Sequence, residues 1–154
     1  MQLTSPVFTH QGIVPEEYAF KGKNRNPPLF ISQVPARAIS LALIMHDPDA
    51  WGGRDFLHWI VWNIPKNTTI INENTLPEDA VMGTNDKGVA GYMRPAPLKG
   101  SGTHHYIFEL HALDALLDLP QGADRLAAQA AISAHTIERA ELVGLYARQD
   151  GRIL

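Results

Sequence analysis

The stretch HDPDAWGGRDFLHWIVWNIP, which runs from His46 to Pro65, places acidic, imidazole and indole side chains directly before an apolar run. Its second half, His58–Ile64 (HWIVWNI), is rich in the β-branched and aromatic residues that favour strands. The Gly52-Gly53 pair ahead of it is a turn signal. The stretch therefore predicts a strand with polar residues gathered near its beginning.

Two further runs have the composition of strands, Ile39–His46 (ISLALIMH) and His105–Leu113 (HYIFELHAL). Both are nearly apolar on each face, which is typical of central strands in a covered sheet. Glycine and proline residues punctuate the chain around them and separate short strands. We expect β-structure to dominate roughly the first 120 residues.

After Pro120 the pattern becomes helical. Asp124 can cap a short helix that runs through Ile132, because its carboxylate accepts hydrogen bonds from free N–H groups of the first turn. A second helix is predicted at about Ala134–Arg148, where three apolar residues would share one face: Ile137, Leu142 and Leu145. Strands followed by helices indicate a β-rich or α+β domain and not alternating βαβ units.

The length and composition of the chain exclude several classes of protein. Its 154 residues suit a single domain, and no linker or composition shift divides residues 1–154. The absence of cysteine excludes disulfides, thiolate zinc sites and cysteine nucleophiles, and favours a reducing compartment. A net charge of −3 with scattered basic residues argues against nucleic-acid binding. The first residues, MQLTSPVFTH, do not resemble a signal peptide, and no apolar run reaches the ~18 residues of a membrane span, so we expect a soluble cytoplasmic protein without integral membrane association.

Polar residues fall at one end of each predicted strand. Side chains alternate along a strand, so Asp47 shares a face with the apolar residues at positions 41, 43 and 45. By the same alternation His58 lies on the face of positions 60 and 62, and His104 lies on the face of Tyr106. If the strand ends meet, these four side chains converge over an apolar floor, the usual make-up of a small-molecule site.

Each of these residues also has a purely structural interpretation. A lone histidine or aspartate often caps a turn or satisfies a hydrogen bond in the core. Asp47 and Asp49 could form a carboxylate pair, but their spacing across a proline is equally typical of a turn. His104 and His105 point to opposite faces of an extended strand and make a poor chelate, so we predict no metal site. The chain contains no GxSxG, HExxH or GxxxxGK[ST] motif.

Two longer segments, MHDPDA…FLHWIVWNIP and GYMRPAPLKGSGTHHYIFELHALD, resemble motifs of the phosphatidylethanolamine-binding protein family, and most of all its bacterial Raf-kinase-inhibitor-like branch. The resemblance covers nearly the whole chain, from LTSPVF through NPPL to HTIERAELVGLYAR. It implies a large antiparallel β-sheet packed on a smaller sheet, with short C-terminal helices. It also implies a small preformed pocket for an anion such as phosphate or for a phosphorylated head group, with no cofactor.

The resemblance assigns the pocket to particular residues. Asp47 matches the first aspartate of the family's DPDAP element, and His58 matches the histidine of its HW element. His104 and Tyr106 match the histidine and tyrosine of its HxY element. Imidazole and phenol donors can hold an oxyanion, while Asp47 can orient an imidazole or accept a proton from the ligand.

The rim and wall of the pocket depart from the family pattern. The resemblance assigns them to Asp49 and to the PAPL segment that contains Pro97. Trp51 replaces the final proline of DPDAP and is expected to cover part of the opening. Arg94 replaces the glycine before the wall, where it either adds a cation at the mouth or is simply solvated, and Leu98 replaces the second proline of the wall. These departures leave the ligand's size and identity open.

The resulting prediction is a non-enzymatic binding protein for a small anion or a phosphorylated small molecule. One alternative is an inhibitor that contacts a kinase or a serine protease. Another is a hydrolase in which His58 or His104 acts as general base and Asp47 orients it, although no nucleophile is evident. Bacterial relatives are often homodimers, so the resemblance also implies a homodimer.

Overall fold

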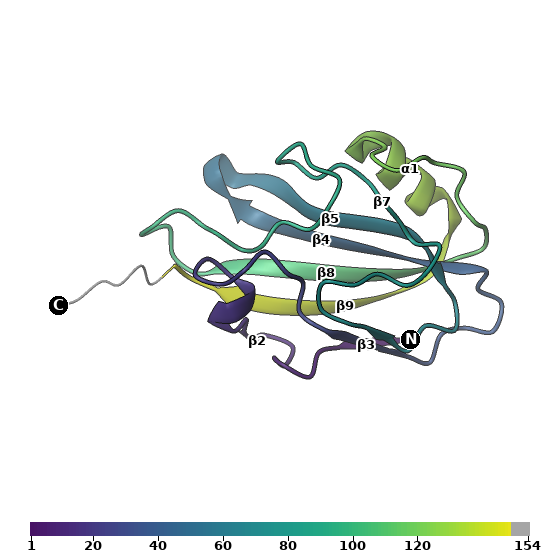
Figure 1. Cartoon of the computed structure of the whole chain (residues 1–154), viewed down its shortest axis with the longest axis horizontal. Helices are drawn as coiled ribbons and strands as arrows, with labels where there is room; N and C mark the ends of the chain where they lie inside the picture. The colour runs from purple at the N-terminus through teal and green to yellow at the C-terminus, as the bar shows by residue number, and fades with distance from the viewer. Residues whose placement is uncertain (149–154) are drawn as a thin grey trace.

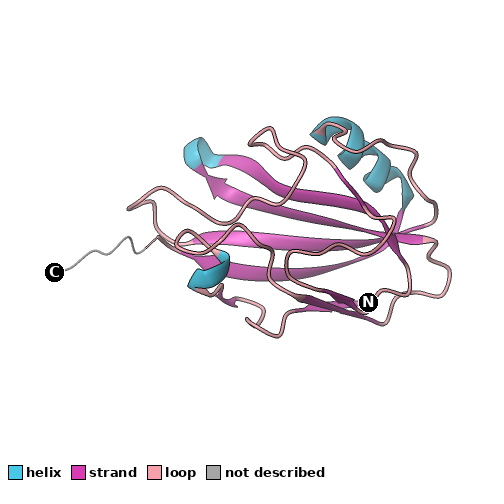
Figure 2. Ribbon diagram, in the orientation of Figure 1, coloured by secondary structure: helices cyan, strands magenta, loops and turns pink. Residues whose placement is uncertain are grey.

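The computed structural model describes residues 1–148 and contains two β-sheets and one α-helix (Figure 1, Figure 2). The two short 3-10 helices are η1 (Glu16–Tyr18) and η2 (Trp51–Gly53), and the α-helix is α1 (Arg125–His135). The strands are β1 (Gln2–Thr4), β2 (Gly12–Ile13), β3 (Leu29–Ser32), β4 (Ser40–Ala50), β5 (Arg54–Pro65), β6 (Ile70–Ile71), β7 (Val81–Met82), β8 (His104–Leu113) and β9 (Thr136–Tyr146).

The larger sheet has six strands in the order β2-β9-β8-β4-β5-β7, and the smaller has three in the order β1-β3-β6. All neighbouring strands are antiparallel except the short parallel pair β2 and β9. Long strands β4, β5, β8 and β9 form the centre of the larger sheet, and the smaller sheet lies against one side of it (Figure 1). The predicted mainly β fold with a large sheet on a smaller one is confirmed.

Both faces of the larger sheet are buried. The core between the two sheets contains Met45, Trp59 and Phe108, whereas the opposite face packs Ile60 and Trp62 against α1 and the segment before it. Trp59 and Trp62 therefore lie on opposite faces, as their spacing predicts, and both fill a core. This double coverage explains why the central strands are apolar on each side.

The three predicted strands and the first predicted helix are present. β5 and β8 contain their predicted runs, and β4 contains its run except for Ile39 and continues to Ala50. The carboxylate of Asp124 accepts a 2.8 Å hydrogen bond from the backbone N–H of Ala127, so it caps α1 as predicted. Ala128 and Ile132 form the buried face of this helix against the sheet.

The second predicted helix, Ala134–Arg148, is wrong, because most of that segment forms β9. Its backbone pairs with β8 along nearly the full length of both strands, which satisfies its N–H and C=O groups without a helix. Ala140 and Leu142 face the core between the sheets, while Arg139 and Glu141 alternate with them toward solvent. The spacing of Ile137, Leu142 and Leu145 fits one face of a helix, but long-range pairing with β8 overrides this local pattern.

No helix within residues 1–148 is long and apolar enough to cross a membrane.

Gly144 in β9 is a position where any side chain would collide with the core. A Cβ atom placed there would lie 2.5 Å from Cγ2 of Val14 and 2.9 Å from Cε2 of Phe8, both buried. We predict that Gly144→Ala lowers the free energy of unfolding by about 1–3 kcal/mol, because this core is already filled.

The matched control is Gly91→Ala, whose new methyl group would meet nothing nearer than 3.8 Å. It should change the free energy of unfolding by less than about 0.5 kcal/mol. Urea unfolding measures both variants, and equal effects would contradict the packing account of β9.

Candidate functional site

A cavity of about 510 Å³ opens where β4, β5 and β8 end, at the side of the larger sheet that faces the smaller one. The sequence-predicted residues line it: Asp47, Asp49, His58, Pro97, His104 and Tyr106. Side chains that the sequence singled out as departures from the family also line it: Trp51, Arg94 and Leu98. The structure thus places every predicted site residue around one space.

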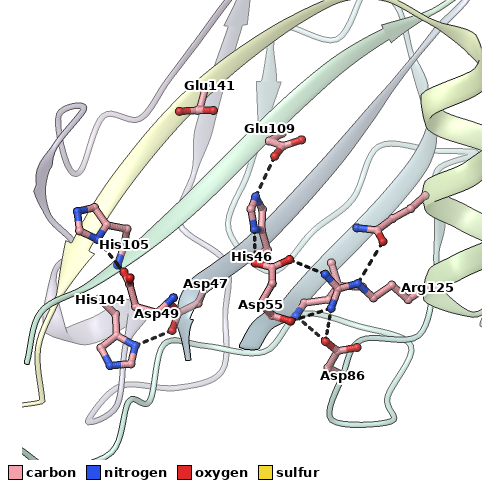
Figure 3. A network of polar contacts seen from close by, with 12 residues as sticks. His46, Asp47, Asp49, Asp55, Asp86, His104, His105, Glu109, Arg125 and Glu141 are labelled. Atoms are coloured by element: carbon pink, nitrogen blue, oxygen red, sulfur yellow. Dashed lines mark hydrogen bonds and ion pairs between the residues drawn. The ribbon is translucent and has the colours of Figure 1, made fainter. Parts of the chain in front are cut away.

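Asp47 contacts His104, and both side chains line the cavity; Figure 3 shows the contact between them. Oδ2 of Asp47 lies 2.7 Å from Nδ1 of His104, and both side chains are almost fully buried. Oδ1 of Asp47 accepts a 2.8 Å hydrogen bond from the backbone N–H of Asp49. Because both carboxylate oxygens have donors, Asp47 acts as an orienting group whose negative charge is largely compensated.

Ser101 completes this chain of contacts at the other nitrogen of His104. Its Oγ lies 2.9 Å from Nε2 of His104 and also donates a 2.6 Å hydrogen bond to the carbonyl oxygen of Leu98. A serine hydroxyl has one proton, so donation to Leu98 requires that Nε2 of His104 carries its own proton. If Ser101 instead donates to Nε2 of His104, its hydrogen bond to the carbonyl oxygen of Leu98 is lost.

His58 reaches the cavity because of a β-bulge. Met45 pairs with Trp59 and His46 pairs with Leu57, which leaves His58 as the extra residue in β5. Its ring contacts that of Tyr106, with centroids 5.3 Å apart. The prediction from strand alternation that His58 shares a face with Ile60 and Trp62 is therefore wrong.

The surroundings of His58 keep its ring neutral. Nδ1 lies 2.6 Å from the carbonyl oxygen of Met93, which accepts the ring proton. Burial is the main cause that lowers the pKa of His58 below its usual value, and it outweighs the hydrogen bond to Met93. Nε2 is consequently a hydrogen-bond acceptor on the cavity side at neutral pH.

The hydroxyl of Tyr106 is buried and makes no hydrogen bond of normal length among residues 1–148, although the carboxylate of Asp47 is near enough to interact with it. Burial, and next the nearby carboxylate of Asp47, raise the pKa of Tyr106, so the phenol keeps its proton. A buried hydroxyl without a partner costs about 1–3 kcal/mol. Tyr106 is therefore a donor that awaits an acceptor in the cavity.

The rim combines cations with exposed apolar groups. The indole of Trp51 is 78% exposed and Leu98 is 53% exposed. Arg94 lines the cavity and its Nε is buried without a hydrogen-bond partner in the described part of the chain, which favours the cation at the mouth over simple solvation. Lys87 adds a second basic residue to the lining. The rim is thus positively charged as well as apolar.

Asp49 lies at the rim, and its carboxylate is hydrogen-bonded to His105. The backbone N–H and Nδ1 of His105 lie 2.9 Å and 2.7 Å from Oδ2 of Asp49. Burial opposes ionisation, but these hydrogen bonds outweigh it and lower the pKa of Asp49. Asp49 therefore shapes the rim more than it presents a free carboxylate to the cavity.

A second polar network supports the β4–β5 tip from the opposite face of the sheet (Figure 3). Nδ1 of His46 lies 2.6 Å from Oδ1 of Asp55, and its Nε2 lies 2.8 Å from Oε2 of Glu109. Arg125 at the start of α1 binds the carboxylates of Asp55 and Asp86. The network links β4, β5, β8 and α1 beside the residues that line the cavity.

Opposite charges tune the ionisation of this network. Burial alone would lower the pKa of His46, but hydrogen bonds to Glu109 and Asp55 outweigh it and raise the pKa. Hydrogen bonds from His111, and next from His46, hold the pKa of Glu109 far below its usual range. Within residues 1–148 no group of three or more histidine, aspartate or glutamate side chains is arranged to hold a metal ion.

The sequence did not single out three contributors to the cavity. Ser101 lies three residues before His104 in a glycine-rich turn, and nothing in a single sequence distinguishes it from an ordinary turn serine. Met93 acts through its carbonyl oxygen, which leaves no side-chain signal. Phe56 could have been found, because it precedes His58 by two residues in the same strand and its ring centroid lies 4.9 Å from that of His58.

Comparisons with known proteins agree with this fold. The family model described as phosphatidylethanolamine-binding protein matches residues 4–147. A protein of Methanothermobacter thermautotrophicus named UPF0098 protein is 42% identical and covers 96% of this chain and 99% of its own. LppC of Mycobacterium tuberculosis, named as a candidate lipoprotein, is 38% identical and covers 95% of this chain and 72% of its own. The crystal structure of Escherichia coli YbcL, described as a new member of the mammalian PEBP family, has a TM-score of 0.90 at 30% identity and covers 96% of this chain and 98% of its own.

The fold and cavity define a two-sheet β protein with a pocket at the ends of its central strands. This chain belongs to the phosphatidylethanolamine-binding protein family. The family resemblance of its sequence motifs is thereby confirmed.

The His46 network predicts a stability that depends on pH. Folding raises the pKa of His46. The stabilisation that protonated His46 adds to the folded state is therefore fully present below the unfolded pKa of about 6.5, and it is lost as the pH rises through the higher folded pKa. We predict that His46→Gln lowers the free energy of unfolding by ~2 kcal/mol at pH 6 and by clearly less at pH 9.

Urea unfolding at a series of pH values measures this difference. The control is His135→Gln, because His135 pairs with Asp114 on the surface, where such pairs contribute at most about 1 kcal/mol. A difference between wild type and His46→Gln that stays constant from pH 6 to pH 9 would contradict the proposed charge on His46.

Proposed function

We propose that this protein binds a small oxyanion or a phosphorylated small molecule in the cavity formed by Asp47, His58, His104 and Tyr106. The observation that carries the proposal is the buried hydroxyl of Tyr106, which lacks a partner among the described residues. Buried polar groups are nearly always satisfied, so an unpaired donor that lines a cavity suits a bound acceptor. Phosphate-type ligands offer several acceptor oxygens.

The charges around the cavity favour an anion. The carboxylate of Asp47 is compensated by the His104 ring and by a backbone N–H, and Asp49 is compensated by His105. Arg94 and Lys87 then leave an excess of positive charge at the mouth. Such an arrangement attracts an anion, whereas two free carboxylates would repel it.

His58 adds a preference for a ligand that carries a proton. Its neutral ring presents Nε2 as an acceptor, because Nδ1 already donates to Met93. A protonated phosphate oxygen or the ammonium group of a phosphorylated amine can donate to it. Donors at Tyr106 and an acceptor at His58 therefore suit a partly protonated phosphate or a phosphorylated amino alcohol.

Titration with phosphate and phosphoethanolamine tests the proposal through the imidazole signals of His58 and His104 in nuclear magnetic resonance spectra. We predict that both signals shift at millimolar ligand. Tyr106→Phe should weaken binding about tenfold or more, since a hydrogen bond to a charged group contributes ~1.5–3 kcal/mol. The same variant should keep or raise the free energy of unfolding, because it removes a buried hydroxyl without a partner.

Tyr92→Phe is the matched control. The hydroxyl of Tyr92 is also buried without a partner in the described residues, but Tyr92 does not line the cavity. It should affect stability as Tyr106→Phe does and leave ligand binding unchanged. The proposal fails if the His58 and His104 signals stay still, or if both tyrosine variants bind as wild type does.

A second candidate function is ester hydrolysis, and the contacts of Ser101 favour it. Ser101, His104 and Asp47 follow one another in the order of a serine hydrolase triad, at 2.9 Å and 2.7 Å. In this function Oγ of Ser101 attacks an acyl carbon while Nε2 of His104 takes its proton. The competing hydrogen bond from Ser101 to Leu98 opposes this role, because it points the hydroxyl proton away from His104.

A panel of acyl esters and phosphoesters separates the two functions. If binding is the function, wild type and Ser101→Ala show equal background rates. Turnover by the wild type that disappears in both Ser101→Ala and Asp47→Asn would establish the hydrolase instead.

The remaining parts of the proposal concern location and partners. A cytoplasmic location follows from the absence of cysteine, and a homodimer follows from the family resemblance. Cell fractionation and analytical ultracentrifugation test these two points. Inhibition of a kinase or a serine protease stays a separate prediction, which pull-down experiments with cavity variants would test.

A further inference from the structure

The cavity is much larger than the anion that its polar end can hold. Its volume of about 510 Å³ lies in the ~300–1,000 Å³ range of pockets for organic ligands. A phosphate has five non-hydrogen atoms and fills a fraction of this space. The cavity can therefore hold a sizeable organic group attached to the anion.

The cavity lining contains both polar and apolar side chains. The polar groups include the hydroxyl of Tyr106 and the ring of His104, and the apolar ones include Trp51, Met93 and Leu98. Such a lining suits a ligand with a charged end and an apolar end. Trp51 and Leu98 are exposed, so the apolar end would lie toward the mouth.

Trp51 is the largest side chain at this mouth and has an exposed face. It is 78% exposed, while the two other tryptophans of the chain, Trp59 and Trp62, are almost fully buried. The turn between β4 and β5 carries it outward, with Gly52 and Gly53 both at positive φ. A flat indole offers a stacking surface for a planar ring, and leaving it in water costs free energy that a ligand can recover.

We propose that Trp51 is a specificity-determining residue that stacks on the organic group of the ligand, and that the ligand is a phosphate monoester of a planar aromatic alcohol. This inference rests on the proposed anion site and adds the chemical class of the rest of the ligand. Leu98, 53% exposed, and Arg94 line the same cavity, so they can offer an apolar contact to the ring and a positive charge to the phosphate. Trp51, Arg94 and Leu98 are the three positions at which this chain departs from the motifs of its family, so this preference would be particular to it.

The experiment compares dissociation constants for inorganic phosphate, phenyl phosphate and hexyl phosphate. We expect phenyl phosphate to bind about 3- to 10-fold more tightly than phosphate, in line with the contribution of an aromatic pair. This affinity ratio should fall to about one in Trp51→Ala and recover in Trp51→Phe, which keeps a ring. Leu126→Ala, which removes an exposed apolar side chain of α1 that does not line the cavity, should leave the ratio unchanged.

Tryptophan fluorescence gives a second readout. Because Trp59 and Trp62 are buried, a change in emission on adding phenyl phosphate but not phosphate reports on Trp51. Equal affinities for phosphate and phenyl phosphate, or a ratio that persists in Trp51→Ala, would overturn the inference and leave the anion site standing. Equal affinities for hexyl and phenyl phosphate would overturn the aromatic assignment. If none of the three ligands binds, the proposed function fails and this inference fails with it.

Discussion

The hydrogen-bonded pairing of β4 with β5 and β8 positions both hydrophobic cores and the cavity. One extra residue in β5 determines which side chain of that strand points into the cavity. His58 is the bulged residue between the pairs Met45–Trp59 and His46–Leu57. Before the bulge Leu57 packs on the α1 side of the sheet, and after it Trp59 packs on the side of the smaller sheet. The bulge therefore turns His58 toward Tyr106, while both tryptophans remain in their cores.

The polar groups around the cavity differ in how completely they are satisfied. The carboxylates of Asp47 and Asp49 are both compensated by hydrogen-bond donors. In the second polar network the side chains of His46 and Glu109 bind each other. The hydroxyl of Tyr106 and Nε of Arg94 are the exceptions, because both are buried without a partner among residues 1–148. A fold that satisfies its carboxylates but leaves these two cavity donors unpaired is arranged to receive an acceptor. The second polar network joins β4, β5, β8 and α1 beside the cavity, an arrangement that favours donor positions formed before the ligand binds.

Much of this arrangement could be predicted from the sequence, and the failures have physical causes. The apolar runs in β4, β5 and β8 and the cap at Asp124 depend on local composition, which a single sequence shows directly. Thr136–Tyr146 was predicted as helix because Ile137, Leu142 and Leu145 share a helical face, but pairing with β8 makes the segment a strand. His58 was placed on the wrong face because a bulge shifts the alternation by one residue and leaves no local mark. Its assignment to the pocket came from the expected convergence of strand ends and from the family resemblance. Ser101 and the carbonyl oxygen of Met93 join the site through tertiary contacts that composition does not encode.

The most direct test of the central claim is to locate an anion in the crystal. Crystals grown without phosphate, sulfate or acetate would be soaked with selenate, whose anomalous scattering marks its position. The account predicts a peak in the cavity with an oxygen within hydrogen-bonding distance, ~2.5–3.0 Å, of the Tyr106 hydroxyl. A cavity that stays empty, or selenate bound only to surface lysine and arginine residues, would contradict it.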